Sequence, residues 1–390
     1  MHLADLPSPA LLVDRARLDA NLDAMQARAD ENGVALRPHV KTHKSVEIAL
    51  RQRERGAVGL TIATVGEAEV FARFGFDDLC IARPVVGRDA LARVATLLAG
   101  KTRVTFCVDT LAGARQANAF FAEQGQTADV LLEVDTGHGR TGIRWNHPDA
   151  ASLVRDLAGL PSLTLAGLLT HGGQAYGGPR QGETKQDALR RYMTEERDRL
   201  LTFAATLGRA RLLTPDAILS LGSTPTLSVF ENATRDGFTI TEVRPGNYVF
   251  YDRQQVTLGT TTLDRCALTV RATVIAQHRT PTGGEMAYLD AGKKILTTDL
   301  GWNVRDHGQI LHSPHTMKPL PHARIARLSE EHGWVRVPGA TTFDVGDTVR
   351  IVPNHACVTM ATQDRFYVIE RTGKDGEEVV AEWTVDARGA

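Results

Sequence analysis

The first 250 or so residues alternate between short apolar runs and helical segments, and this alternation limits the possible folds more than any other feature. Continuous apolar runs separated by helices are typical of parallel strands that are buried on both faces of a sheet. Eight such runs occur, at residues 34–40, 59–64, 78–83, 103–109, 129–135, 163–171, 217–223 and 241–250. A first helix is expected from Asp14 to Asn32, because Leu18, Leu22 and Met25 form one apolar stripe. Eight units at this length predict a closed (β/α)8 barrel of the TIM type over residues 1–250, with an open doubly wound sheet as the alternative.

The sequence changes character after about residue 251, as expected for a chain too long for one core. Segments such as "ALTVRATVIAQH" (267–278) and "RFYVIER" (365–371) alternate apolar and polar residues and are joined by short turns. This period of two predicts an antiparallel β domain over residues 251–390, without helices. About the first 12 residues of the chain are a candidate segment for packing with this second domain.

Charge and cysteine usage exclude several classes of protein. The chain carries 45 basic and 46 acidic residues, which argues against a nucleic-acid binder that depends on phosphate contacts. No apolar run approaches the length of a membrane span, and the N-terminus lacks the features of a signal peptide. Four cysteines without a paired spacing favour a reducing cytoplasm over secretion. A cytoplasmic enzyme acting on a small molecule fits this composition.

Polar residues gather where the predicted strands end. In a barrel of this kind, the C-terminal ends of the strands line the active site, whatever its chemistry. The residues at these ends are His39, Lys41 and His43; Asp135, His138 and Arg140; His171, Gln174 and Tyr176; Gly222, Ser223 and Thr224; and Arg244, Gly246, Asn247 and Tyr248. We therefore expect the active site among them.

Lys41 is the candidate nucleophile. A lysine among apolar strand ends and other cations has a lowered pKa, so that its amine can form a Schiff base. A solvated loop lysine is the alternative. The segments "SLGSTPT" and "RPGNY", at the last two strands, offer backbone N–H groups and hydroxyls for a phosphate, although ordinary turns would also explain them. A Schiff-base lysine facing a phosphate site indicates pyridoxal phosphate.

A second motif, "VPNHACVTM", places His355 and Cys357 two residues apart after a predicted strand. In extended geometry these side chains point to the same side, so imidazole and thiolate can bind one ion. Nitrogen and sulfur ligands suit zinc, and two protein ligands leave positions open, as in a catalytic site. An accidental spacing with a buried core cysteine is the alternative.

Several motifs together resemble a known family. "RPHVKTHK", "DTGHGRTGI", "THGGQAY", "GSTPT", "EVRPGNYVFYD" and "PNHACVT" are similar, in order, to the alanine-racemase-like (fold-type III) enzymes that use pyridoxal phosphate. The likeness is greatest to the D-serine dehydratase and D-threonine aldolase branch, and it extends from about residue 7 to residue 360. It implies a barrel, a C-terminal β domain and a homodimer with each site near the subunit interface.

The resemblance also implies residue roles. Lys41 matches the lysine that binds the cofactor, and Arg140 the arginine at its phenolic oxygen. His171, Gln174 and Tyr176 match the cofactor pocket, with His171 expected to be catalytic. Ser223, Thr224, Gly246 and Asn247 match the phosphate site, and Arg244 lies where some members have an arginine facing the pyridine nitrogen. His355 and Cys357 match the metal ligands of the dehydratases, which favours zinc, whereas the aldolases carry an oxygen ligand that suits manganese or magnesium.

Three activities remain open with these residues. The first is a D-serine dehydratase (D-serine ammonia-lyase) that produces pyruvate and ammonia. The second is retro-aldol cleavage of a D-β-hydroxy amino acid to glycine and an aldehyde, as in a D-threonine aldolase. The third is dehydration of D-threo-3-hydroxyaspartate, which requires a further cation for the second carboxylate. A non-catalytic pyridoxal phosphate carrier is the rival from another class, but it would correspond to the barrel alone.

Overall fold

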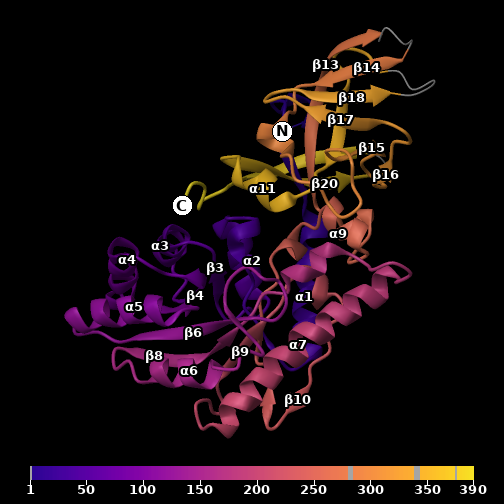
Figure 1. Ribbon diagram of the computed structural model, residues 1–390. Helices are drawn as coiled ribbons and strands as arrows, with labels where there is room; N and C mark the ends of the chain where they lie inside the picture. Colours follow the sequence, from indigo (N-terminus) through magenta and orange to yellow (C-terminus); the bar gives the residue numbers. More distant parts are fainter. Residues whose placement is uncertain (1, 280–283, 338–342, 374–375) are drawn as a thin grey trace. The chain divides into compact units, whose positions relative to one another are not determined.

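The computed structural model describes residues 2–279, 284–337, 343–373 and 376–390 (Figure 1). The chain divides into two compact units, each assembled from segments that are far apart in the sequence. The β unit comprises Met1–Ala24, Thr42–Glu47 and Asn247–Gly389, and the barrel unit comprises Met25–Lys41, Ile48–Gly246 and Ala390.

The barrel unit is built on eight parallel strands that form one sheet, as the apolar runs predict. Their order is β2 (Ala35–Leu36), β12 (Glu242–Val243), β9 (Ile218–Leu221), β8 (Leu163–Leu169), β6 (Ala128–Asp135), β5 (Arg103–Val108), β4 (Asp78–Pro84) and β3 (Leu60–Ile62). A parallel bridge between His39 and Thr61 joins the first strand segment to the last strand. The backbone N–H of Thr61 also donates to the carbonyl of Pro38 at 2.9 Å. The sheet therefore closes, and the prediction of a (β/α)8 barrel is confirmed.

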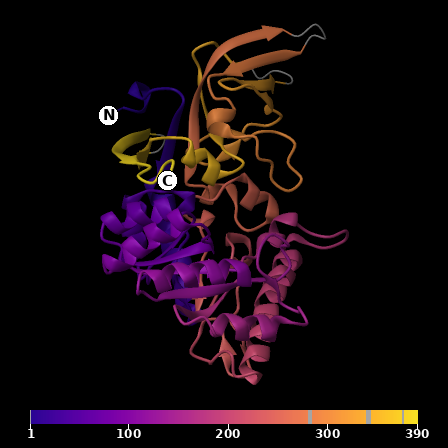
Figure 2. The ribbon, with the colours of Figure 1, turned by 60° about the vertical axis from the view of Figure 1, so that its left-hand side comes forward.

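Helices connect most of these strands. They are α1 (Arg15–Glu31), α2 (Val46–Glu54), α3 (Val65–Arg73), α4 (Arg88–Ala99), α5 (Leu111–Glu123), α6 (Ala150–Ala158), α7 (Lys185–Arg209) and the short α8 (Thr224–Leu227). Helices α3 to α7 pack against the outside of the barrel strands (Figures 1 and 2). Three smaller pieces complete the unit, namely β7 (Ile143–Arg144) beside β6 and the hairpin of β10 (Thr234–Arg235) and β11 (Phe238–Thr239). No helix within the described ranges is long and apolar enough to cross a membrane.

The eighth predicted strand, 241–250, is wrong in its length. Only Glu242 and Val243 form a strand, and the chain then turns into the 3-10 helix η4 (Asn247–Val249). Pro245 explains the early end, because proline has no N–H group to continue a strand ladder. The boundary between the two units falls between Gly246 and Asn247, so Asn247 belongs to the β unit.

Most side chains buried in the barrel unit are apolar. Phe106 of β5 and Phe121 of α5 stack with ring centroids 6.1 Å apart. Cys80 and Cys107 are buried beside Leu131, and burial raises the pKa of both thiols. These two cysteines are therefore core residues, as their position in strand patterns predicts.

The β unit contains the other large sheet. Its main path is β16 (Lys318–Pro319), β15 (Gln309–Ser313), β19 (Thr348–Val352), β13 (Leu268–Arg279), β1 (Ala10–Asp14), β20 (Arg365–Thr372) and β21 (Gly376–Thr384). Three further strands continue from β13, in the order β14 (Glu285–Leu289), β18 (Gly333–Val337) and β17 (Arg324–Leu328). Strand β1 comes from the N-terminus and lies between β13 and β20.

The predicted antiparallel β domain is confirmed, since the strands after residue 267 pair antiparallel with one another, but two features were not predicted. Strand β1 pairs antiparallel with β13 but parallel with β20. Short helices interrupt the strands, namely α9 (Arg253–Leu258), α10 (Lys293–Leu296) and α11 (Ala356–Ala361), besides the 3-10 helices η1 (Leu3–Asp5) and η5 (Leu263–Arg265). Helices of four to six residues carry too little periodicity to be recognised in a sequence rich in strands.

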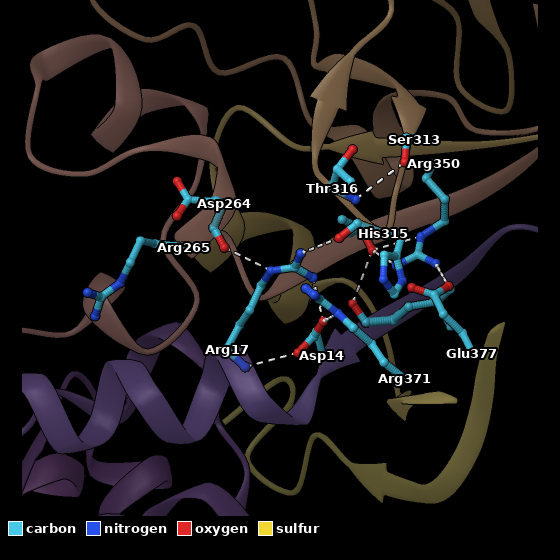
Figure 3. Close-up of polar contacts among 12 residues, drawn as sticks. Asp14, Arg17, Asp264, Arg265, Ser313, His315, Thr316, Arg350, Arg371 and Glu377 are labelled. Carbon is cyan, nitrogen blue, oxygen red and sulfur yellow. Dashed lines mark hydrogen bonds and ion pairs between the residues drawn. The ribbon is translucent and has the colours of Figure 1, made fainter. Parts of the chain in front are cut away.

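A buried polar cluster lies at the junction of β1 and α1 in the β unit (Figure 3). Asp14 begins the helix by accepting the backbone N–H of Arg17 at 2.9 Å, and its carboxylate pairs with the guanidinium groups of Arg17 and Arg371. Arg350 pairs with Glu377 at 2.7 Å, and both side chains are more than nine-tenths buried. Each buried charge thus has an opposite partner, which burial requires.

Candidate active site

The predicted site residues divide between the two units. Lys41, Arg140, His171, Gln174, Tyr176, Ser223, Thr224, Arg244 and Gly246 belong to the barrel unit, whereas Asn247, His355 and Cys357 belong to the β unit.

Lys41 lies just beyond the first barrel strand. Strand β2 ends at Leu36, and the 3-10 helix η2 (Val40–Thr42) carries the lysine. Its backbone N–H donates to Nδ1 of His39 at 3.4 Å, and His39 is buried and paired through its backbone with Thr61 of β3. The half-buried lysine therefore stands at the strand end, on backbone held by the closure of the barrel.

His171 gathers several of the predicted residues around it. Its ring lies 5.7 Å from that of His138, and the two planes are nearly perpendicular. Burial lowers the pKa of His171 well below its usual 6.5, and the positive charges of Lys41, Arg140 and Arg244 lower this pKa further. The imidazole is consequently neutral at neutral pH and can accept a proton. Four residues predicted from separate strand ends thus share one electrostatic environment.

Arg140 has a partner that the sequence reasoning missed. Its Nη2 lies 3.9 Å from Oε1 of Glu133, a buried carboxylate on β6. The hydroxyl of Thr141 donates to the same oxygen at 2.7 Å. Burial raises the pKa of Glu133, and Arg140 and the Thr141 hydrogen bond oppose this rise. A carboxylate inside the apolar run "LLEVD" was the available signal, because such a group requires a partner.

Arg244 is held by a chain of buried hydrogen bonds. Its Nε donates to the hydroxyl of Ser220 at 2.8 Å, and its Nη2 donates to the carbonyl of Thr170. Ser220 donates to Glu242 at 2.6 Å, and the other oxygen of Glu242 pairs with Nε of Arg37 at 2.6 Å. All five residues are buried. The guanidinium of Arg244 is therefore fixed before any ligand binds, which is what a positioned electrostatic group requires.

Gln174 and Tyr176 lie in the 3-10 helix η3 (Gly173–Gly177), after β8. Both polar atoms of the Gln174 amide are buried and have no hydrogen-bond partner among the residues that the structure describes. A buried amide without partners is costly, so this position is suited to a polar ligand group. Ser223 and Thr224 begin α8, and both are buried. The Ser223 hydroxyl donates to the carbonyl of Gly172 at 3.2 Å, which links this turn to the loop that carries Gln174.

Glu196 is a second residue that the sequence reasoning missed. It lies on α7, is wholly buried, and accepts the backbone N–H of Gly222 at 3.0 Å. A Cβ atom at Gly172 would lie 2.2 Å from its other carboxylate oxygen, so this glycine permits the close approach. Burial raises the pKa of Glu196 to about 7. Glu196 therefore contacts the loop after β8 at Gly172 and the loop after β9 at Gly222.

His355 and Cys357 are close to each other, but the extended geometry expected for them is wrong. His355 is extended and precedes helix α11, whereas Cys357 lies in the first turn of that helix. The two side chains nevertheless interact electrostatically. Burial disfavours the charged form of both side chains. The attraction between a positive imidazole and a negative sulfur outweighs this effect, so the pKa of His355 is raised and the pKa of Cys357 is lowered.

The residues around this pair complete its environment within the β unit. Nδ1 of His355 lies 2.6 Å from Oδ2 of Asp299. The sulfur of Cys357 lies 3.1 Å from the hydroxyl of Thr42. Nδ2 of Asn247 donates to the carboxylate of the buried Asp252 at 2.5 Å. The same nitrogen lies 3.7 Å from the sulfur of Cys357. The amide nitrogen of Asn247 thus contacts both groups, whereas its amide oxygen is buried and has no hydrogen-bond partner among the described residues.

The donor chemistry fits both predicted groups. Lys41, the unpartnered amide of Gln174 and the fixed Arg244 suit a polar aromatic aldehyde such as pyridoxal phosphate. His355 and Cys357 supply nitrogen and sulfur, and a carboxylate on the other nitrogen of a histidine is the usual outer partner at metal sites. The described part of the chain contains no group of three or more His, Cys, Asp or Glu residues that could hold a metal ion. A metal ion held by His355 and Cys357 alone would have positions left for a substrate.

Comparison with known proteins agrees with the fold. The family model described as alanine racemase, N-terminal domain, matches residues 13–254, and the model described as putative serine dehydratase domain matches residues 267–369. D-threo-3-hydroxyaspartate dehydratase of Delftia sp. (strain HT23) is 33% identical, with 95% of this chain and 96% of that protein covered. D-threonine aldolase of Arthrobacter sp. is also 33% identical, with 99% and 94% covered.

Other relatives are similar over the same length. D-serine dehydratase of Dictyostelium discoideum is 26% identical, with 94% of each chain covered. The solved structure of the Delftia enzyme matches this fold with a TM-score of 0.85 at 32% identity, covering 98% of both chains. A cysteine-to-alanine mutant of the same enzyme, solved in the metal-free form, also has a TM-score of 0.85 at 31% identity and the same coverage.

The chain therefore belongs to the alanine-racemase-like family, in the branch that carries a serine dehydratase domain. It is an enzyme of the lyase class, among dehydratases and aldolases of D-hydroxy amino acids. Pyridoxal phosphate is the cofactor expected of this fold.

Proposed function

We propose that the protein is a D-serine dehydratase that converts D-serine into pyruvate and ammonia, with pyridoxal phosphate and zinc as cofactors. The observation that carries this proposal is the pairing of His355 with Cys357 beside Asp299. Imidazole and thiolate form a ligand set that suits zinc better than the harder ions manganese and magnesium. The serine dehydratase domain that matches residues 267–369 contains both ligands.

In this proposal the barrel residues perform the proton transfer. Bound pyridoxal phosphate supplies an electron sink for negative charge at the α-carbon of the substrate. The ε-amine of Lys41 takes the α-proton, and the neutral imidazole of His171 is available as a second proton acceptor. Arg140 and Arg244 hold the cofactor ring, and Ser223, Thr224, Gly246 and the backbone of Asn247 hold its phosphate. Gln174 and Tyr176 line the pocket.

The hydroxyl group of the substrate is the second difficulty, because hydroxide is a poor leaving group. Zinc held by His355 and Cys357 would supply Lewis acidity at this hydroxyl. A D-threo-3-hydroxyaspartate dehydratase similar to this chain has been solved as a cysteine-to-alanine mutant in the metal-free form, which is consistent with a metal in this branch of the family. Manganese or magnesium is the alternative ion if oxygen ligands dominate the site.

Two other activities have support of their own. The D-threonine aldolase and the D-threo-3-hydroxyaspartate dehydratase are each 33% identical to this chain, against 26% for the D-serine dehydratase. Aldol cleavage needs deprotonation of the same hydroxyl, and the hydroxyaspartate reaction needs a cation for the second carboxylate. The sulfur ligand argues against the aldolase, which carries an oxygen ligand in its place, and hydroxyaspartate would need a further cation; for these reasons we place D-serine dehydration first.

Product analysis separates these activities. The purified enzyme, loaded with pyridoxal phosphate and zinc, is incubated separately with D-serine, D-threonine and D-threo-3-hydroxyaspartate, and with L-serine as the control. The proposal expects pyruvate and ammonia from D-serine and no reaction with L-serine. Glycine and an aldehyde from D-threonine, without pyruvate from D-serine, would assign the aldolase activity instead. Oxaloacetate as the dominant product would assign the hydroxyaspartate dehydratase.

A further inference from the structure

The sulfur of Cys357 has two neighbouring groups that can donate hydrogen bonds to it, both from distant parts of the sequence. The hydroxyl of Thr42 lies 3.1 Å away, and Nδ2 of Asn247 lies 3.7 Å away. Thr42 is wholly buried, and Asn247 is 5% exposed. A sulfur that binds a metal ion does so as a thiolate and has no hydrogen to give, so both contacts would then run from the oxygen or nitrogen to the sulfur.

The orientation of the Asn247 amide is determined by a buried carboxylate. Asp252 accepts from Nδ2 of Asn247 at 2.5 Å, and it also accepts the backbone N–H groups of Ala356 at 2.9 Å and Gln255 at 3.1 Å. Turning the amide over would place its oxygen against a carboxylate and a sulfur, which repel it. The nitrogen therefore stays directed at Cys357.

Asp252 links these contacts to the ligand pair itself. The N–H group of Ala356, the residue between His355 and Cys357, is one of its three donors. The start of α11, the amide of Asn247 and the sulfur are thus held as one buried unit. Such a set of contacts restricts the rotamer of Cys357 beyond what its own helical turn requires.

We propose that Thr42 and Asn247 are positioning residues for the metal, which donate hydrogen bonds to the Cys357 sulfur and hold it beside His355. This inference rests on the proposed function, because the proposed function assigns the ion to that pair. Hydrogen bonds to a ligating atom fix its direction and stabilise its charge, and loss of such an outer partner typically lowers metal affinity by about 10- to 100-fold. Thr42 directly follows Lys41 in the chain, so one short segment carries both a cofactor residue and a metal-positioning residue.

Zinc affinity of the holoenzyme tests the inference without reference to turnover. The enzyme loaded with pyridoxal phosphate is stripped of metal, and its zinc dissociation constant is measured by competition with a chelator. Thr42→Val keeps the shape of the side chain but removes the hydroxyl, and the affinity is expected to fall about 10- to 100-fold. Thr42→Ser restores the donor and should restore the affinity.

The chain offers a matched control on the ligand helix. Thr359 on α11 is wholly buried, and its hydroxyl has no hydrogen-bond partner within the described ranges. Thr359→Val makes the same change two residues from Cys357 and should leave zinc affinity unchanged. Zinc X-ray absorption adds a direct readout, because the Zn–S distance of about 2.3 Å should give a weaker and more disordered sulfur signal in Thr42→Val.

The possible outcomes are distinct. Thr42→Val with the zinc affinity and sulfur signal of the wild type would overturn the inference alone. A wild-type holoenzyme that binds no zinc would overturn the metal part of the proposed function, and this inference with it. If Thr42→Val does not fold, Asn247→Ala provides the second variant, and it too is expected to bind zinc more weakly; an unchanged affinity there would count against the inference.

Discussion

Nδ1 of His355 lies 2.6 Å from Oδ2 of Asp299, and this contact joins the end of strand β19 to a loop 56 residues earlier in the chain. A carboxylate on one ring nitrogen fixes both the orientation of the ring and the nitrogen that remains free. Within the β unit, Asp299 therefore supports His355 on one side of the ligand pair, and Thr42 and Asn247 support Cys357 on the other.

Replacement of Asp299 tests this support. Asp299→Asn keeps the size of the side chain but removes its charge, and we expect zinc affinity to fall about 10- to 100-fold. The measurement is chelator competition on the holoenzyme. Asp77→Asn, at an exposed position of the barrel unit, is the control for loss of one negative charge. Equal affinities of the Asp299 variant and the wild type would show that the contact does not orient the ligand.

Replacement of Lys41 tests the cofactor assignment. A cofactor linked to a lysine absorbs at the border of the visible and ultraviolet, so Lys41→Ala should abolish this band. Lys44, three residues later, provides the control, because its Nζ donates to the carbonyl of Ala387 within the β unit. Lys44→Ala should keep the band. A band that survives in Lys41→Ala and disappears in Lys44→Ala would move the linkage to the other lysine.

Glu196 predicts a pH dependence of stability. Burial raises the pKa of this carboxyl group from 4.5 to about 7, so between these pH values the folded chain holds a proton that the unfolded chain has lost. The free energy of unfolding should therefore fall by up to ~3 kcal/mol as the pH rises from about 4.5 to about 7. Above pH 7 it should remain at this lower value. Glu196→Gln cannot ionise and should lack this fall.

Urea unfolding of both proteins at pH 5 and pH 8 measures the effect. The free energy of unfolding of Glu196→Gln, relative to that of the wild type, should be higher at pH 8 than at pH 5, because glutamine places no charge in the buried site. Glu231→Gln, at an exposed position, is the control and should follow the wild type at both pH values. Parallel behaviour of Glu196→Gln and the wild type would mean that the carboxyl group is ionised throughout.

Asp14 predicts a large structural effect in the β unit. The carboxylate is 2% exposed, begins helix α1 and neutralises Arg17 and Arg371 (Figure 3). Asp14→Ala leaves buried positive charge without a partner, which typically costs 3–5 kcal/mol, on the order of the stability of a small domain. Thermal unfolding should show the loss. The surface carboxylate Asp364, which pairs with exposed Arg388, offers the comparison, since Asp364→Ala should cost about 1 kcal/mol or less.

Much of the fold could be predicted from local sequence patterns. The apolar runs of the barrel reflect strands that are buried on two faces, and the period-two segments of the β unit reflect strands that are buried on one face. Each pattern can be recognised within a single segment. The strand ends then indicated Lys41, His171 and Arg244, because a parallel barrel directs its C-terminal strand ends to one side. Where local signals were weak, as in the four- to six-residue helices of the β unit, the prediction failed.

The supporting residues could not be predicted in this way. Glu196, Glu133 and Asp299 look like ordinary charged residues until the chain is folded, and each acquires its role from a partner that no spacing rule connects to it. Thr42 and Cys357 are 315 positions apart.

The sequence by itself therefore determined the order and type of the barrel strands and predicted the candidate reactive side chains, because backbone propensity and burial are encoded within a few neighbouring residues. The tertiary structure alone decided which groups hold those side chains in place and how their pKa values shift. Hydrogen bonds and Coulomb interactions depend on distances in space, and only the closed barrel and the assembled β sheet establish these distances.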